Sequence, residues 1–111
     1  MHRRVQTEDR KRAAFRALQD RILTGPGRAS PEQRAGAFRN AGLAPPLGGL
    51  LGKVATRPTQ VTDADFAAAR AAGFTEDELF ELVICAAVGQ SGRLYDAGLA
   101  ALADVAGEED G

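Results

Sequence analysis

The side chains of this chain that could do chemistry are gathered in one apolar segment near its end. Glu81, Cys85 and Arg93 follow one another at intervals of four and eight residues, so on a helix they form a line of carboxylate, thiol and guanidinium along one face. Such a line could form a single-cysteine redox centre, in which the Arg93 charge lowers the pKa of the Cys85 thiol and Glu81 transfers a proton.

Three physical arguments oppose the redox interpretation. Arg93 lies two helical turns beyond Cys85, about 12 Å along the axis, so only its long side chain could bridge part of the gap. A Glu81 carboxylate disfavours a neighbouring thiolate because both are anions. Cys85 also stands in the run Val-Ile-Cys-Ala-Ala, where a cysteine is typically a small buried hydrophobic residue. The pattern therefore favours packing for Cys85 over reactivity.

Polar residues interrupt the same segment a few positions later. Gln90, Arg93 and Tyr95 could line a pocket between helices and bind a small polar or anionic ligand. The simpler alternative is one buried amide beside an exposed helix midpoint. In that case Gln90 needs hydrogen-bond partners inside the protein.

Local signals mark where the helices that position these residues begin and end. Capping boxes start at Ser30 and Thr75, Thr7 can cap a first helix, and Gly73 follows a fourth. Gly89 and Gly92 leave it open whether the last helix is continuous or splits in two. No segment alternates as a strand does, so the sequence predicts one all-α domain, residues 1–111, with a charged N-terminal helix and a short acidic tail. The predicted helices cover residues 7–23, 31–40, 47–54, 62–72 and 75–104.

The last predicted helix is rich in alanine and glycine. A helix with such small side chains gains by letting neighbouring helices approach closely. A single domain of 111 residues has only a modest core of its own, so another subunit is an expected neighbour. The sequence therefore predicts self-association, with satisfaction of this surface inside one chain as the alternative.

Composition excludes several classes of function. The 14 basic and 15 acidic residues nearly cancel, which argues against a dedicated nucleic-acid binder. The sequence has no apolar run of about 18 residues and no leader pattern, so we expect a cytoplasmic protein without a membrane segment. With one cysteine and one histidine, His2, we expect no metal site and no cofactor. Capping explains Asp63 and Asp65, and the glycine-rich residues 47–53 lack the spacing of a phosphate-binding loop.

A short helix, a glycine, a capping box and a long alanine-rich helix follow one another in the segment V-T-D-A-D-F-A-A-A-R-A-A-G-F-T-E-D-E-L-F-E-L-V-I-C-A-A-V-G-Q. This order of elements resembles the carboxymuconolactone decarboxylase and AhpD-like superfamily. The match covers residues 53–102, and it implies an AhpD-like helical bundle that assembles as a trimer, hexamer or related ring. Peroxidases of that family carry a Cys-x-x-Cys pair and a histidine, and this chain has neither at a matching position. Glu81 alone falls where family members often carry a glutamate.

The resemblance and the residues together predict a non-redox, AhpD-like protein that works as an oligomeric binding or accessory module for a partner enzyme or a small polar ligand. One alternative is an enzyme of the same class, either a single-cysteine peroxidase or a decarboxylase- or isomerase-like catalyst. In the latter, Glu81 would act as the base and Arg93 would hold a carboxylate. A third possibility is an interaction protein that acts through the charged residues 1–16.

Overall fold

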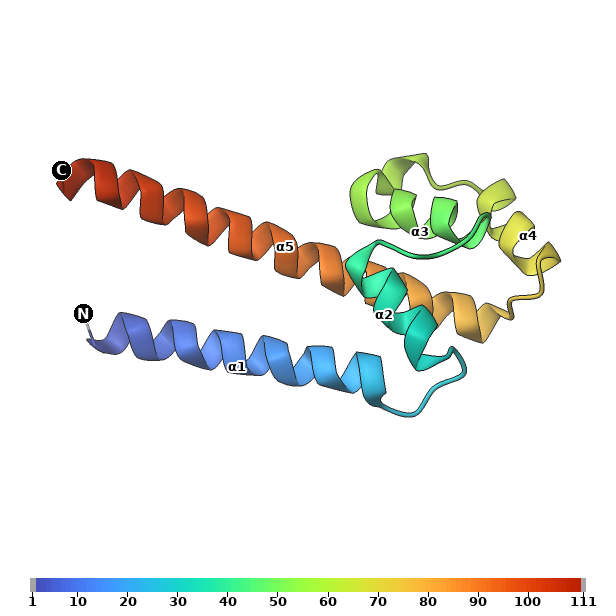
Figure 1. The fold of residues 1–111 in the computed structure, drawn as a ribbon, viewed down its shortest axis with the longest axis horizontal. Coiled ribbons are helices and arrows are strands. Elements are labelled where there is room, and N and C mark those ends of the chain that lie inside the picture. Colours follow the sequence, from blue (N-terminus) through green and yellow to red (C-terminus); the bar gives the residue numbers. More distant parts are fainter. Residues whose placement is uncertain (1, 111) are drawn as a thin grey trace.

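A computed structural model describes the backbone of residues 2–110 and the side chains of residue 7 and residues 9–107. His2, the first charges of the N-terminal helix and the acidic side chains of the predicted tail therefore lie outside the described side chains. Within the described part, the chain is all-helical, as predicted, with one short 3-10 turn (Figure 1). The elements are α1 (His2–Thr24), α2 (Pro31–Arg39), α3 (Leu47–Thr56), η1 (Pro58–Gln60), α4 (Asp63–Ala71) and α5 (Glu76–Asp110).

The capping signals form as the sequence predicts. The Ser30 side chain accepts the backbone N–H of Gln33, and the Gln33 side chain accepts that of Ser30. Thr75 and Glu78 form the same reciprocal pair at the start of α5. These contacts satisfy backbone donors that a helix start otherwise leaves without partners.

The predicted start of the first helix is wrong. Thr7 lies inside α1, which begins at His2. The residues before Thr7 include no proline or glycine, and arginine is a good helix former, so the helix continues past Thr7 towards the N-terminus.

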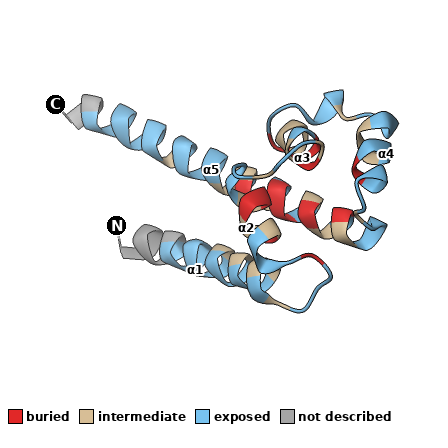
Figure 2. Ribbon diagram, turned by 45° about the vertical axis from the view of Figure 1, so that its right-hand side comes forward, coloured by how far each residue is buried: buried red, intermediate tan, exposed pale blue. Residues whose placement is uncertain are grey.

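The core lies where the first half of α5 packs against α2 and α3. Figure 2 shows the buried residues concentrated there, while α1 and the second half of α5 are largely exposed. The fully buried side chains of greatest volume are Leu50, Leu51, Leu82 and Cys85. Among helices α1 to α5, none is both long and apolar enough to cross a membrane.

The last helix is continuous through both glycines, which settles the alternative left open by the sequence. A methyl group at Gly89 would collide with the carbonyl oxygen of Phe38, and one at Gly92 would lie 2.7 Å from the Phe15 ring. Both glycines therefore serve close packing inside the chain, Gly89 against the end of α2 and Gly92 against α1.

Two helical segments extend beyond the body of the molecule. α1 and the second half of α5 leave it in the same direction and separate towards their ends, so both termini lie on one side (Figure 1). The molecule is elongated as a result, with principal extents of 56 × 29 × 20 Å. We call residues 91–107 of α5 the C-terminal arm. Its side chains are almost all exposed, including the large apolar residues Leu94 and Leu102.

Candidate functional site

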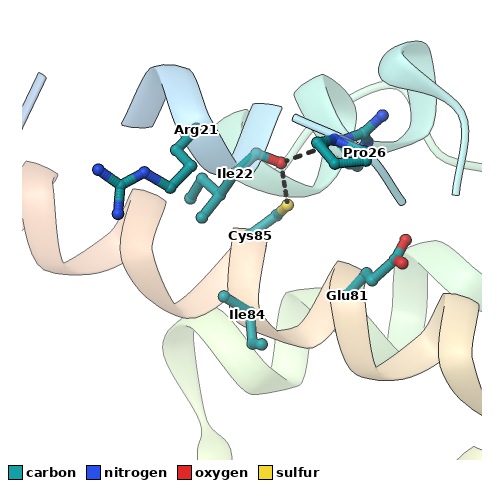
Figure 3. Close-up of a pocket in the computed structure, with 7 residues that line it drawn as sticks. Arg21, Ile22, Pro26, Glu81, Ile84 and Cys85 are labelled. Atoms are coloured by element: carbon teal, nitrogen blue, oxygen red, sulfur yellow. Dashed lines mark hydrogen bonds between the residues drawn. The ribbon is translucent and has the colours of Figure 1, made fainter. Parts of the chain in front are cut away.

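A pocket of about 190 Å³ lies where α1, α2 and α5 meet, and it includes two of the predicted site residues. Glu81 and Cys85 enter it from consecutive turns of α5 (Figure 3). The remaining lining residues come from the end of α1, the loop that follows it, α2 and α5. They are Arg21, Ile22, Pro26, Arg34 and Ile84.

Cys85 is fully buried, as a packing role predicts. Its thiol lies 3.8 Å from the carbonyl oxygen of Ile22, to which it donates a weak hydrogen bond (Figure 3). Burial raises the pKa of this thiol; the charge of Arg34 opposes the increase, and that of Glu81 adds to it. A thiol that is protonated and closed to solvent is a poor nucleophile.

Glu81 holds the loop between α1 and α2 against α5. Its carboxylate accepts the backbone N–H of Arg28 at 2.7 and 2.9 Å and that of Ala29 at 2.7 Å. The approach is close enough that a methyl group at Gly27 would lie 2.9 Å from a carboxylate oxygen. The N–H groups of Ala29 and then Arg28 hold the pKa of Glu81 below its usual value, and nearby arginine charges lower it further. A carboxylate stabilised in this way is a weak base.

Arg34, which the sequence analysis did not single out, supplies a buried cation to this pocket beside the exposed Arg21. It is buried, with 6 % of its surface exposed, and its guanidinium donates to the carbonyl oxygens of Gly25 at 2.7 Å and Ile22 at 3.4 Å. These carbonyls belong to the C-terminal end of α1, where a positive charge is favoured. The one signal that could have found Arg34 is its spacing of three residues from Ala37, which places both on the buried face of α2.

The structure does not bring Arg93 into this pocket. Its guanidinium donates to the carbonyl oxygen of Phe38 at 2.7 Å, at the end of α2, and to the side-chain oxygen of Gln90 at 2.8 and 3.1 Å. Gln90 is half-buried and has the partner that its burial requires. The pair therefore ties α5 to α2, because Gly89 lets the same Phe38 carbonyl approach the helix.

Tyr95 lies in a second depression, of about 210 Å³, between α1 and α5. Phe15, Gly92 and Asp96 line it as well, and Arg12 and Arg16 border it from α1. The five predicted site residues are therefore divided between three places, with Glu81 and Cys85 in one, Gln90 and Arg93 in another and Tyr95 in the third.

Both aspartates at the start of α4 lie in its first turn, and the predicted capping contact is formed by Asp65. Asp65 accepts the backbone N–H of Thr62 at 2.9 Å and bonds the Lys53 ammonium at 3.0 Å. These contacts, with that of Thr62 first, lower the pKa of Asp65. Among the described residues, no three histidine, cysteine or acidic side chains come together as a metal site would require.

Comparisons with protein-family models, with curated proteins and with solved structures found no match for this chain. The interpretation of the pocket and of the exposed helices rests on the residues themselves.

Proposed function

We propose that this chain is a non-redox, AhpD-like helical protein that acts as an oligomeric binding or accessory module. The observation that carries the proposal is a contrast within α5. The first half of the helix engages the candidate reactive groups in contacts that hold the fold together, and its outward side and C-terminal arm expose large apolar side chains.

The contacts of the reactive groups argue against thiol chemistry. A peroxidatic cysteine must present a thiolate to peroxide, and Cys85 is buried with a raised pKa. The two groups that could assist it are engaged elsewhere, Glu81 by backbone amides and Arg93 by the end of α2. Each of these contacts is accounted for by packing of the loop and of α2 on α5.

The exposed helices argue for assembly. An exposed helix of a monomeric protein normally directs charged and polar residues to solvent on its outward face. The C-terminal arm instead exposes Leu94, Leu102 and Val105. Apolar surface that runs along one helix in this way is typical of a contact with another protein chain.

Native mass spectrometry across a concentration series tests the oligomeric part of this proposal, and a peroxide-turnover assay tests the non-redox part. We expect a defined oligomer and no peroxide consumption above the background of the buffer. Turnover that disappears in Cys85→Ser would overturn the non-redox assignment. A strictly monomeric chain at about 100 µM, where weak self-association becomes visible, would overturn the oligomeric assignment.

The pocket itself favours a second candidate, an enzyme of the decarboxylase or isomerase kind. Glu81 and the buried cation Arg34 line one cavity, so a small carboxylate could be held by Arg34 beside a potential base. On this alternative Glu81→Gln folds with wild-type stability and loses activity. The lowered pKa of Glu81 and its engagement by backbone amides favour the structural role.

A further inference from the structure

Five of the six large exposed hydrophobic residues of α5 lie on a single face, and the sixth, Tyr95, borders that face and lines the depression between α1 and α5. The numbers of the five differ by steps of three and four residues or by sums of such steps, and at 3.6 residues per turn they fall within a stripe about 100° wide. Leu82, Ala86 and Gly89, which are buried, lie on the opposite face. The exposed fractions are 68 % for Phe80, 37 % for Ile84, 63 % for Leu94, 54 % for Leu102 and 54 % for Val105.

Small residues fill the remaining positions of this face. Ala87, Ser91, Gly98 and Ala101 continue the alternation of four- and three-residue steps, which is the spacing of a helix-pairing seam. A methyl group at Gly98 would meet nothing within 4 Å, so this glycine is not used for packing inside the chain. We call these small residues and the five large ones together the outer stripe of α5.

We propose that the outer stripe is the surface through which two copies of this chain pair, α5 against α5 in antiparallel orientation. This inference rests on the proposed oligomeric function and names its interface. It differs from the alternative in which the charged helix α1 makes the contact, because the pairing surface is uncharged and belongs to α5 alone.

Size supports a second copy as the occupant. At 1.5 Å per residue, the stripe from Phe80 to Val105 is about 38 Å long. Its large side chains leave several hundred Å² uncovered in each chain, and the small residues between them add to this area. A standard protein interface covers about 800 Å² on each partner, so a pair of such stripes approaches the area that a stable dimer needs.

Charge supports the same occupant. No Asp, Glu, Lys or Arg lies on the outer stripe between Phe80 and Val105. In a two-fold symmetric pair, a charged residue near the axis lies close to its own copy on the partner. Such like charges would oppose pairing. An uncharged stripe avoids this cost in self-pairing.

The sizes of the residues favour the antiparallel orientation. In a parallel pair each residue faces itself, so Phe80 would meet Phe80 while Ser91 met Ser91, and the helix separation would have to vary along the seam. The antiparallel pair combines large with small residues in two of its layers and keeps the separation more even. The facing pairs of that arrangement are Phe80 with Val105, Ile84 with Ala101, Ala87 with Gly98, and Ser91 with Leu94.

Analytical ultracentrifugation of the full chain, of Leu94→Glu and of a matched control, Ala100→Glu, tests the surface. Ala100 is exposed on the same helix but on the opposite face. We expect Leu94→Glu to raise the dissociation constant of the pair at least about a hundredfold, because it places two like charges in the seam. Ala100→Glu should leave the dissociation constant within about threefold.

Each outcome decides between the proposals. A wild-type oligomer that persists in Leu94→Glu would overturn the outer stripe as the interface and leave the oligomeric function standing. A wild-type chain that is monomeric would overturn both. Circular dichroism verifies that Leu94→Glu is folded, and Val105→Glu, on the same stripe, replaces it if it is not.

Disulfide cross-linking tests the orientation. Ala87→Cys and Gly98→Cys are made in separate chains, with the buried Cys85 retained and the unmodified chain as the control. In the antiparallel pair, position 87 faces position 98, and two copies of residue 87 lie about 16 Å apart, beyond disulfide reach. Oxidation should therefore link the mixed chains and neither variant alone. Links in each variant alone would refute the antiparallel orientation.

Discussion

Replacing Glu81 with glutamine separates a structural role of this carboxylate from a catalytic one. The carboxylate accepts two backbone N–H groups, those of Arg28 and Ala29, through three contacts of 2.7 to 2.9 Å. Glutamine keeps the size of the side chain but removes its charge, and only one of its two terminal atoms can accept a hydrogen bond. One of the two N–H groups must therefore share an acceptor or turn to water.

The expected loss of stability follows from these contacts. A hydrogen bond to a charged group contributes about 1.5–3 kcal/mol when it is protected from solvent. Because Glu81 is only half-buried, we expect Glu81→Gln to lower the free energy of unfolding by about 1–2 kcal/mol. For a domain of this length the corresponding decrease in Tm is roughly 5–10 °C.

Thermal and urea unfolding of Glu81→Gln measure this change. Glu76→Gln is the matched control, since it removes the same charge from the same helix, where Glu76 makes only an exposed ion pair with Arg70 at 3.0 Å. That pair contributes no more than about 1 kcal/mol. If Glu81→Gln is as stable as the wild-type chain, the carboxylate does not hold the loop, and its role has to be sought in catalysis.

Three further predictions address the same half of α5. Cys85 should resist a thiol reagent at pH 7 in the folded chain and react fully in urea; rapid labelling of the folded chain would show that the thiol is accessible. Since the folded-state pKa of Glu81 is lowered, its stabilising contribution is present above the ordinary glutamate pKa of 4.5 and is lost as the pH falls through the folded value, so the stability difference between wild type and Glu81→Gln should shrink in acid. Gly89→Ala should destabilise the fold by about 1–3 kcal/mol because the new methyl group meets the Phe38 carbonyl, whereas Gly49→Ala, where nothing lies within 4 Å, should be neutral or stabilising by up to about 1 kcal/mol; equal effects would mean that α2 does not pack closely at Gly89.

The features predicted correctly from the sequence are those that depend on interactions between residues only a few positions apart. The Ser30 and Thr75 capping boxes need only partners three positions away, and both form. Gly73 follows α4, as predicted, and its φ of 108° is a backbone conformation that glycine adopts more readily than other residues. The burial of Cys85 could also be predicted, because its immediate neighbours are apolar.

The composition of the pocket could not be predicted in the same way. Arg34 reaches it only because the end of α1 and the first residue after it present the carbonyls of Ile22 and Gly25 to α2. The Arg93 side chain is directed away from Glu81 and Cys85 because its guanidinium donates a hydrogen bond to the carbonyl oxygen of Phe38, a residue distant in sequence. Both assignments depend on contacts between helices, which helical spacing alone does not determine.

The abundance of small residues in α5 predicted that other helices approach it closely, but not whether those helices belong to the same chain or to another subunit. Two of these residues are now accounted for within the chain, since Gly89 meets α2 and Gly92 meets α1. On the other side Ala87 and Gly98 are exposed, a methyl group at Gly98 would meet nothing within 4 Å, and large exposed apolar residues alternate with these small ones. A helix that served only the core of its own chain would gain nothing from leaving Phe80 and Leu94 in water. On our proposal, the two faces of α5 therefore have separate requirements, one met by the fold and the other by association, and a substitution on either face should affect one of them without the other.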